Sequence, residues 1–201
     1  MMMHRSLTAM TTLCLAVTLL AGCSRSPRVT YYTLNPAASP EAATAPAIDS
    51  VAIGAITIPD LLDRPQLVVR TAANQVDILE SHRWADSLKS EIPRIIAQDL
   101  AVLLKPTRVS AYPQNAGLDA TYRVMVDIQR LEMTAGEGVT LDVLWSVRRT
   151  AGGAPKPGRS VVSEPAKAGD YDTLVAAQSR ALAAVSRDLA QALRAEAAMP
   201  Q

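Results

Sequence analysis

Two stretches in the middle of the chain alternate between apolar and polar residues, at 122–129 and at 139–148. A period of two is typical of β-strands that bury one face and expose the other. Gly136 and Gly138 lie between the two stretches and predict a turn. We therefore expect two long antiparallel strands whose polar face meets water or a partner.

Shorter runs of β-branched residues and two helical periods complete the predicted elements. Strands are expected at 31–34, 50–58, 66–70, 75–79, 108–112 and 160–163, with 66–79 forming a hairpin. Apolar residues recur at helical spacing over 86–105 and 172–198. Pro93 predicts a kink in the first helix or the start of a fresh one. The sequence thus predicts a single α+β domain, with a mostly antiparallel sheet and two long helices packed on one face.

Asp99 and the proline-rich stretch 35–47 need separate interpretation. Asp99 falls within the apolar stripe of the first helix, where a hydrogen bond to a nearby backbone group explains a carboxylate better than a functional role does. The stretch 35–47 carries prolines among Ala, Ser and Thr, which is typical of an extended loop.

The first 22 residues resemble a bacterial lipoprotein signal. His4 and Arg5 precede an apolar segment, 7–20, which ends in Leu-Ala-Gly-Cys at 20–23. That segment has about 14 residues, short of the roughly 20 needed to span a bilayer. We expect cleavage before Cys23 and acylation of that cysteine, with 23–30 as a lipidated N-terminus and short tether and 31–201 as the domain.

The residue after the cysteine bears on the membrane that holds the anchor. Position 24 is Ser and not the Asp that retains many lipoproteins at the inner membrane. By that resemblance, the expected location is the periplasmic face of the outer membrane.

Composition argues against nucleic-acid binding and against most catalytic chemistry. Basic and acidic residues nearly balance, at 20 and 19, and there is no Phe, so neither a basic face nor a stacking platform is expected. Of the two cysteines, Cys14 leaves with the signal and Cys23 carries lipid, so no thiol remains. His82 is then the single histidine, and neither a phosphate loop nor a nucleophile elbow is present. We expect no enzyme activity, no cofactor and no metal site.

Two segments carry a resemblance to a known family. Residues 58–70, which include Leu-Leu-Asp-Arg-Pro at 61–65, and residues 82–88 with Trp84 resemble the ABC-type transport auxiliary lipoproteins, the PqiC and YmbA-like family. The resemblance implies an accessory to an MCE-type, ABC-driven system that moves lipids or other hydrophobic molecules between two membranes. Its implied partners are the membrane, an MCE-type periplasmic protein and an ABC transporter permease. Assembly into a homo-oligomer is also possible.

The same segments supply the candidate docking residues, which are Leu61, Leu62, Asp63, Arg64, Pro65 and Trp84. Asp63 and Arg64 either pair locally and set a turn, or Arg64 presents its fork to a partner carboxylate or phosphate. Trp84 either lies buried beneath a helix start or binds a ligand. The leucines become interface candidates if they prove exposed.

Two other functions remain open at this point. One is a lipid-binding carrier with an internal cavity. The other is a structural or assembly lipoprotein of the cell envelope.

Overall fold

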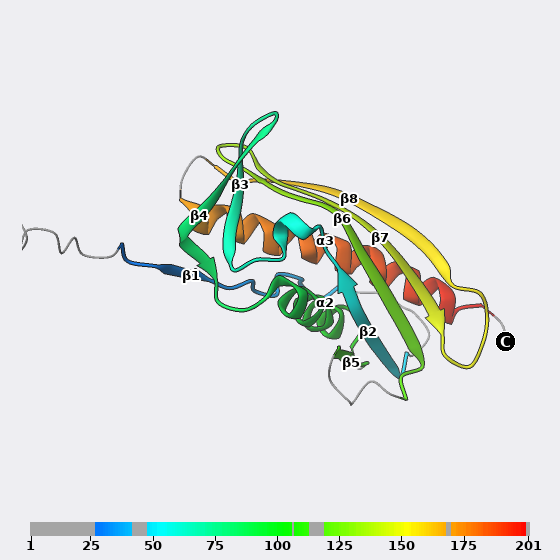
Figure 1. Cartoon of the computed structure of the whole chain (residues 1–201). Coiled ribbons are helices and arrows are strands. Elements are labelled where there is room, and N and C mark those ends of the chain that lie inside the picture. The colour runs from blue at the N-terminus through cyan, green and yellow to red at the C-terminus, as the bar shows by residue number, and fades with distance from the viewer. Residues whose placement is uncertain (1–26, 42–47, 106, 113–118, 168–169, 200–201) are drawn as a thin grey trace, which may run out of the picture.

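One eight-stranded mixed sheet organises the part of the chain that the computed structural model describes, residues 27–41, 48–105, 107–112, 119–167 and 170–199 (Figure 1). The elements are β1 (Thr30–Tyr32), β2 (Ser50–Thr57), the 3₁₀ helix η1 (Asp60–Leu62), β3 (Gln66–Ala72), β4 (Gln75–Trp84), α2 (Leu88–Leu103), β5 (Arg108–Ala111), β6 (Tyr122–Thr134), β7 (Gly138–Arg149), β8 (Lys156–Pro165) and α3 (Tyr171–Ala197). The predicted α+β class is confirmed. The expected signal, 1–22, and Cys23 lie outside the described residues.

The strand order is β1-β4-β3-β6-β2-β5, and β7 and β8 continue from β6. The predicted hairpin β3–β4 and the β6–β7 pair are antiparallel, as is β7–β8. In contrast, β2 pairs in parallel with both β5 and β6, and β1 pairs in parallel with β4. Strands separated by a helix or a long connection can run in the same direction. The sheet is therefore mixed, with antiparallel pairing wherever a short turn joins neighbours.

A β-bulge in β6 explains why this strand extends beyond its predicted end. The register with β7 shifts between Ile128 and Arg130, so the extra residue moves the alternation by one position. Leu131 and Met133 consequently face the core, at 6% and 4% exposure. The strand runs on to Thr134, whereas the simple alternation in the sequence stops at 129.

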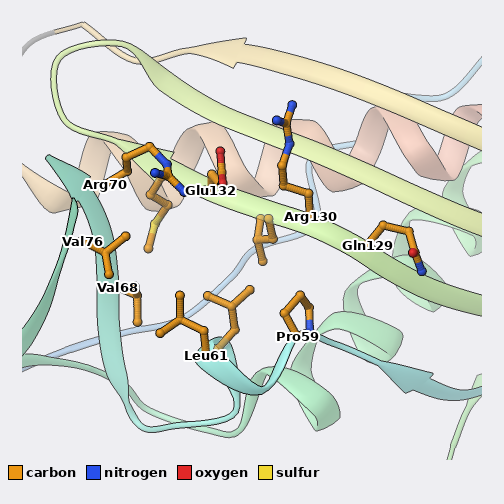
Figure 2. A pocket seen from close by; sticks show the side chains of 11 residues that line it. Pro59, Leu61, Val68, Arg70, Val76, Gln129, Arg130 and Glu132 are labelled. Atoms are coloured by element: carbon orange, nitrogen blue, oxygen red, sulfur yellow. Dashed lines mark hydrogen bonds and ion pairs between the residues drawn. The ribbon is translucent and has the colours of Figure 1, made fainter. Parts of the chain in front are cut away.

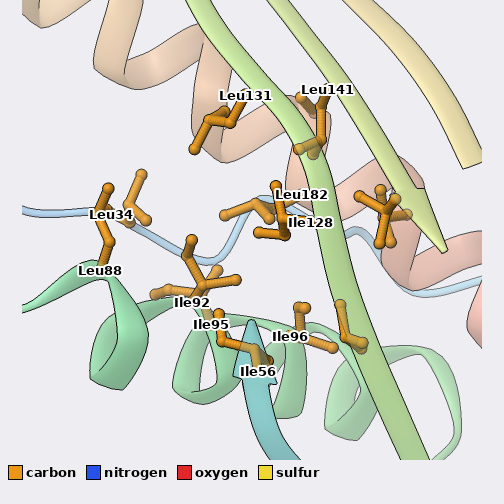
Figure 3. Close-up of a cluster of buried hydrophobic side chains, with 14 of the residues drawn as sticks. Leu34, Ile56, Leu88, Ile92, Ile95, Ile96, Ile128, Leu131, Leu141 and Leu182 are labelled. Carbon is orange, nitrogen blue, oxygen red and sulfur yellow. The ribbon is translucent and has the colours of Figure 1, made fainter. Parts of the chain in front are cut away.

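The two helices cover one face of the sheet (Figure 1). Helix α2 packs on β2 and β5, and α3 packs on β6, β7 and β8. Figure 3 shows residues of α2, such as Ile92, Ile95 and Ile96, gathered with Leu182 of α3 and Ile128 of β6 in the buried core. Both predicted helices are confirmed. Helix α2 begins at Leu88 with Pro93 inside it, so a fresh helix starting at Pro93 is wrong.

The segment after β1 packs against both helices, whereas 35–47 was expected to be an extended loop or linker rather than a packed element. Residues 42–47 of that stretch lie outside the described residues. Leu34 is 3% exposed, and its N–H donates to Oε1 of Glu91 on α2 at 3.0 Å. The N–H of Asn35 donates to Oγ of Ser179 on α3 at 3.2 Å. Side chains from two helices therefore satisfy backbone groups that no sheet partner satisfies.

Asp99 of α2 continues the same arrangement. Its Oδ1 accepts the N–H groups of Ala37 and Ala38, both at 2.9 Å, and the side chain is fully buried. The expected hydrogen bond to nearby backbone is confirmed. We call residues 33–41 the strap, because they cross both helices on the way from β1 into the domain.

Glu91, which holds the strap on α2, is expected to make the stability of the fold depend on pH. Burial raises the pKa of Glu91 above its ordinary value of 4.5, against the opposing effects of the Leu34 N–H and of Arg94. When the pKa of a carboxyl group is higher in the folded than in the unfolded protein, the group favours the folded state fully at pH values below its unfolded pKa. This contribution is lost as the pH rises through the folded pKa, because the charged form is disfavoured in the folded protein. Glu91→Gln keeps an acceptor for Leu34 without an ionisable group. The variant is expected to gain stability relative to the native protein as the pH rises from 4.5, measured by urea unfolding at several pH values. Parallel pH profiles of the two proteins would contradict this expectation.

Candidate functional site

The segment that carried the family resemblance forms a tight turn between β2 and β3. Pro59 precedes η1, and its carbonyl accepts the N–H of Leu62 at 2.9 Å. This single 3₁₀ turn directs the two leucines in different directions. Leu61 is 42% exposed, whereas Leu62 is 8% exposed and belongs to the core.

The end of the turn is attached to two other elements. Asp63 Oδ2 lies 2.6 Å from Lys89 Nζ at the start of α2, so Asp63 pairs with Lys89 rather than with its neighbour Arg64. The carbonyl of Pro65 accepts the backbone N–H of Trp84 at 2.7 Å. Trp84 itself, at the end of β4, is 4% exposed. The turn is therefore held by a backbone hydrogen bond to the end of β4 and by an ion pair to the start of α2.

Arg64 is the least satisfied residue of the turn. Its side chain is partly buried, and Nε has neither solvent contact nor a hydrogen-bond partner within the described residues. A guanidinium stays charged at physiological pH and offers donors in a planar fork. The buried Nε is out of reach of an outside acceptor, whereas the two Nη groups, which have no partner within the described residues, are available to one.

An apolar hollow of about 260 Å³ opens beside η1. Along the edge of β6 that does not pair with β7, β6 pairs with β2 as far as Asp127 and then with β3 from Met133 onward. The hollow occupies the gap between those two pairings. Its apolar lining comes from Pro59, Leu61, Leu62, Val68, Val76, Leu131 and Met133. Figure 2 shows Pro59 and Leu61 on one side, the β3–β4 hairpin on another, and the side chains of β6 facing them.

Polar side chains form the rim of the hollow. Arg70 Nη2 lies 2.6 Å from Glu132 Oε1, and Arg70 Nη1 donates to the carbonyl of Ala73 at 2.8 Å, which holds Arg70 in place. Gln129 and Arg130 line the same edge and are exposed. A hollow with an apolar floor and a charged rim suits a ligand or partner in which polar groups flank an apolar group.

The charge of Arg130 extends onto the open face of the sheet. Arg130 lies opposite Asp142 in the β6–β7 register. Hydrogen bonds from Arg159 to Asp142, at 2.9 and 2.6 Å, lower the pKa of Asp142, and the charge of Arg130 lowers it further. Asp142 is thus satisfied by Arg159, while Arg130 remains at the rim.

Sequence reasoning located the turn but missed the hollow beside it. Of the six candidates, the structure brings Leu61 and Leu62 to the hollow, and it places Asp63, Arg64 and Pro65 in the adjoining turn and Trp84 beneath that turn. The missed lining residues are Val68, Arg70, Val76 and 129–133. The break in alternation at 129 was the available signal, because a bulge often lies at the edge of a site.

Neither a metal centre nor a membrane-spanning helix is found in the described part of the chain. No cluster of three or more His, Cys, Asp or Glu residues there is arranged to hold a metal ion. Within the same residues, no helix combines the length and apolar character needed to cross a bilayer. The described histidine, His82, contacts Tyr32 through a 2.8 Å hydrogen bond between Nδ1 and the hydroxyl.

Two solved structures share this fold. An uncharacterised protein is 18% identical, with a TM-score of 0.64, and the match covers 83% of this chain and 99% of the other. Protein XCC0632 from Xanthomonas campestris is 16% identical, with a TM-score of 0.69, and the match covers 83% of this chain and 95% of the other. No curated protein matches this chain. At these identities the likeness concerns the fold alone.

The structure thus defines an α+β domain with an apolar hollow between β2, β3 and β6, and such a hollow is a candidate binding site. The family model described as ABC-type transport auxiliary lipoprotein component matches residues 32–190. The chain belongs to this family. It is therefore an auxiliary lipoprotein component of ABC-type transport, a class that works in the cell envelope together with a transporter.

Proposed function

We propose that this protein is a non-enzymatic docking subunit, anchored by lipid on Cys23 at the periplasmic face of the outer membrane. It holds an MCE-type periplasmic protein, and through that protein an ABC transporter permease, in a system that moves lipids or other hydrophobic molecules between the membranes. Family membership supports the auxiliary role in transport.

The observation that carries the docking role is the exposure of Leu61 beside the hollow. Leucine is 42% exposed here although the neighbouring Leu62 is buried. An exposed apolar side chain next to an apolar hollow can be covered by a partner, and that burial contributes roughly 25 cal/mol per Å² of apolar area. We call Pro59, Leu61, Asp63, Arg64 and Pro65, together with the hollow, the docking surface. Leu62 and Trp84 support it from beneath.

Arg64 gives the docking surface a preference for an acidic partner group. The local carboxylate, Asp63, is already paired with Lys89 at 2.6 Å. Arg64 makes no ion pair or hydrogen bond within the described residues, and because its Nε is shielded from solvent, its two Nη groups are the donors that a partner can reach. An arginine fork recognises a carboxylate through two parallel hydrogen bonds. A partner with an apolar residue next to Asp or Glu fits both features.

A lipid anchor makes such docking effective even when the contact is weak. An anchored subunit confines its partner to the membrane surface, so that further contacts in the assembly occur at a high effective concentration. Affinity at the docking surface need not be high for the assembly to form.

Leu61→Asp is expected to weaken binding of the purified MCE-type partner by about tenfold or more, because it places a charge in an apolar contact. Leu144→Asp is the matched control, since Leu144 on β7 is 41% exposed and does not line the hollow. Binding is measured by biolayer interferometry, and thermal unfolding is measured for both variants. Equal affinities for the two variants, with both folded, would exclude this docking surface.

The apolar hollow also has to be considered as the site of a lipid-binding carrier. Its volume of about 260 Å³ falls below the roughly 300–1,000 Å³ of sites that enclose small ligands. It would therefore cover only part of a lipid chain, which supports docking over carriage. Native mass spectrometry of the protein purified from membranes tests this, and a retained lipid that is lost in Val68→Asp would favour the carrier.

A further inference from the structure

Three of the five tyrosines of the chain gather at one end of the molecule. Tyr31 and Tyr32 belong to β1, and Tyr171 is the first residue of α3. His82 of β4 connects Tyr32 with Tyr171, because its ring contacts Tyr32 and meets Tyr171 edge-on at 4.5 Å between centroids. Figure 1 shows β1, β4 and the start of α3 together at the end where the chain enters the domain. We call these four residues the aromatic end.

The aromatic end presents a tyrosine to solvent. Tyr31 is 63% exposed, while Tyr32 and Tyr171 are partly buried. Because Tyr31 and Tyr32 are neighbours in β1, their side chains point to opposite faces of the strand. Only one other tyrosine has similar exposure, Tyr112 at 60%. Tyr112 follows β5, which is the opposite end of the strand order from β1.

Chain length limits how far the aromatic end can lie from a lipid anchor on Cys23. Pro27, the first described residue, lies four positions after Cys23, and even a fully extended chain covers only about 14 Å over those four steps. Tyr31 lies within about 28 Å of the acylated residue by the same limit. Tyr112 is separated from β1 by β4, β3, β6 and β2 in the strand order.

Charges around the aromatic end are nearly balanced. Arg28 and Arg83 are accompanied by Glu80, which accepts from Arg83 at 3.3 Å. Asp170 and Asp172 also lie near enough to affect Tyr32. A balanced surface of this kind suits zwitterionic headgroups rather than a strongly anionic patch.

We propose that the aromatic end is a membrane-contacting surface that lies at the headgroup level of the bilayer holding the acyl chains of Cys23. Tyrosine prefers this level because its ring is apolar and its hydroxyl is polar. The contact fixes the orientation of the domain and directs β5, the last strand of the order that begins at β1, away from the bilayer. This inference rests on the proposed lipid anchor.

Single cysteines allow a direct test, because Cys14 leaves with the signal and Cys23 is acylated. Tyr31→Cys and the matched control Tyr112→Cys are each labelled with the same fluorophore in the acylated protein. Both proteins are reconstituted into vesicles of phosphatidylethanolamine and phosphatidylcholine. Quenching by lipids that carry a nitroxide on the headgroup is expected to be at least about twofold greater for the label at 31 than at 112.

The outcomes separate the anchor from the orientation. Protein that does not float with the vesicles would overturn the lipid anchor, and this inference with it. Protein that floats but shows equally weak quenching at both positions would overturn the membrane-contacting surface alone. Protection of position 31 only when a partner protein is added would assign the aromatic end to that partner and would also overturn the inference. Thermal unfolding of the two labelled proteins confirms that both are folded.

Discussion

Protein with Cys23→Ala, exported by a signal that is cleaved without acylation, is expected almost wholly in the soluble periplasmic fraction. The native chain is expected in the membrane fraction, at the density of the outer membrane. Each buried methylene of an acyl chain contributes about 0.8 kcal/mol, so two or more chains form a lasting anchor and their loss removes it. The described part of the chain offers no helix that could replace the anchor. Fractionation on a density gradient measures the effect.

Cys14→Ala in the native chain is the control for this experiment. Cys14 lies in the segment expected to be removed, so its replacement leaves the distribution unchanged. Intact-mass analysis of both proteins identifies the first residue and any acyl chains. A native protein that keeps residues 1–22 without acylation would contradict the anchor, whatever its distribution between fractions.

Gly138→Ala is expected to lower the free energy of unfolding by about 3 kcal/mol or more, a value typical of severe backbone strain and overpacking. Gly138 has φ of +141°, and a Cβ placed there would lie 2.1 Å from the carbonyl oxygen of Glu164 and 2.8 Å from Pro165 Cα. Both are backbone atoms of β8, so no side-chain rotation can relieve the contact. The melting temperature is expected to fall by roughly 10 °C at about 2–4 °C per kcal/mol.

Gly136→Ala is the matched control in the same turn. Gly136 has φ of +77°, and a Cβ there would meet nothing within 4 Å. Only the cost of a positive φ remains, about 1 kcal/mol. Similar losses in the two variants, measured by thermal and urea unfolding, would mean that the approach of β8 does not determine the effect.

The periodic elements were the part of the fold most directly predicted from the sequence. The buried positions Val124, Val126 and Ile128 match the predicted alternation, and Ile92 and Ile95 match the predicted helix face. Period and face follow from the geometry of a single segment, so they need no knowledge of its neighbours. The bulge after Ile128 limited this reasoning, because it shifts the alternation and hides the last part of β6.

The candidate docking residues were found in part. The turn with Leu61 was selected because residues 58–70 resemble the family, but the exposure of Leu61 could not be derived from the sequence. The hollow depends on β6 separating from β2 and meeting β3 further along. These contacts join residues more than 60 positions apart, and no local pattern describes them.

By itself the sequence determined the α+β class, the two helices, the main strands and the expected anchor at Cys23, because each of these follows from a short continuous run of residues. Tertiary structure alone decided the parallel pairings of β2, the course of the strap over Glu91 and Asp99, and the hollow next to Leu61. The physical reason is that long-range packing chooses which buried faces meet. Once they meet, unpaired backbone groups and gaps between strands arise at places that no single segment specifies.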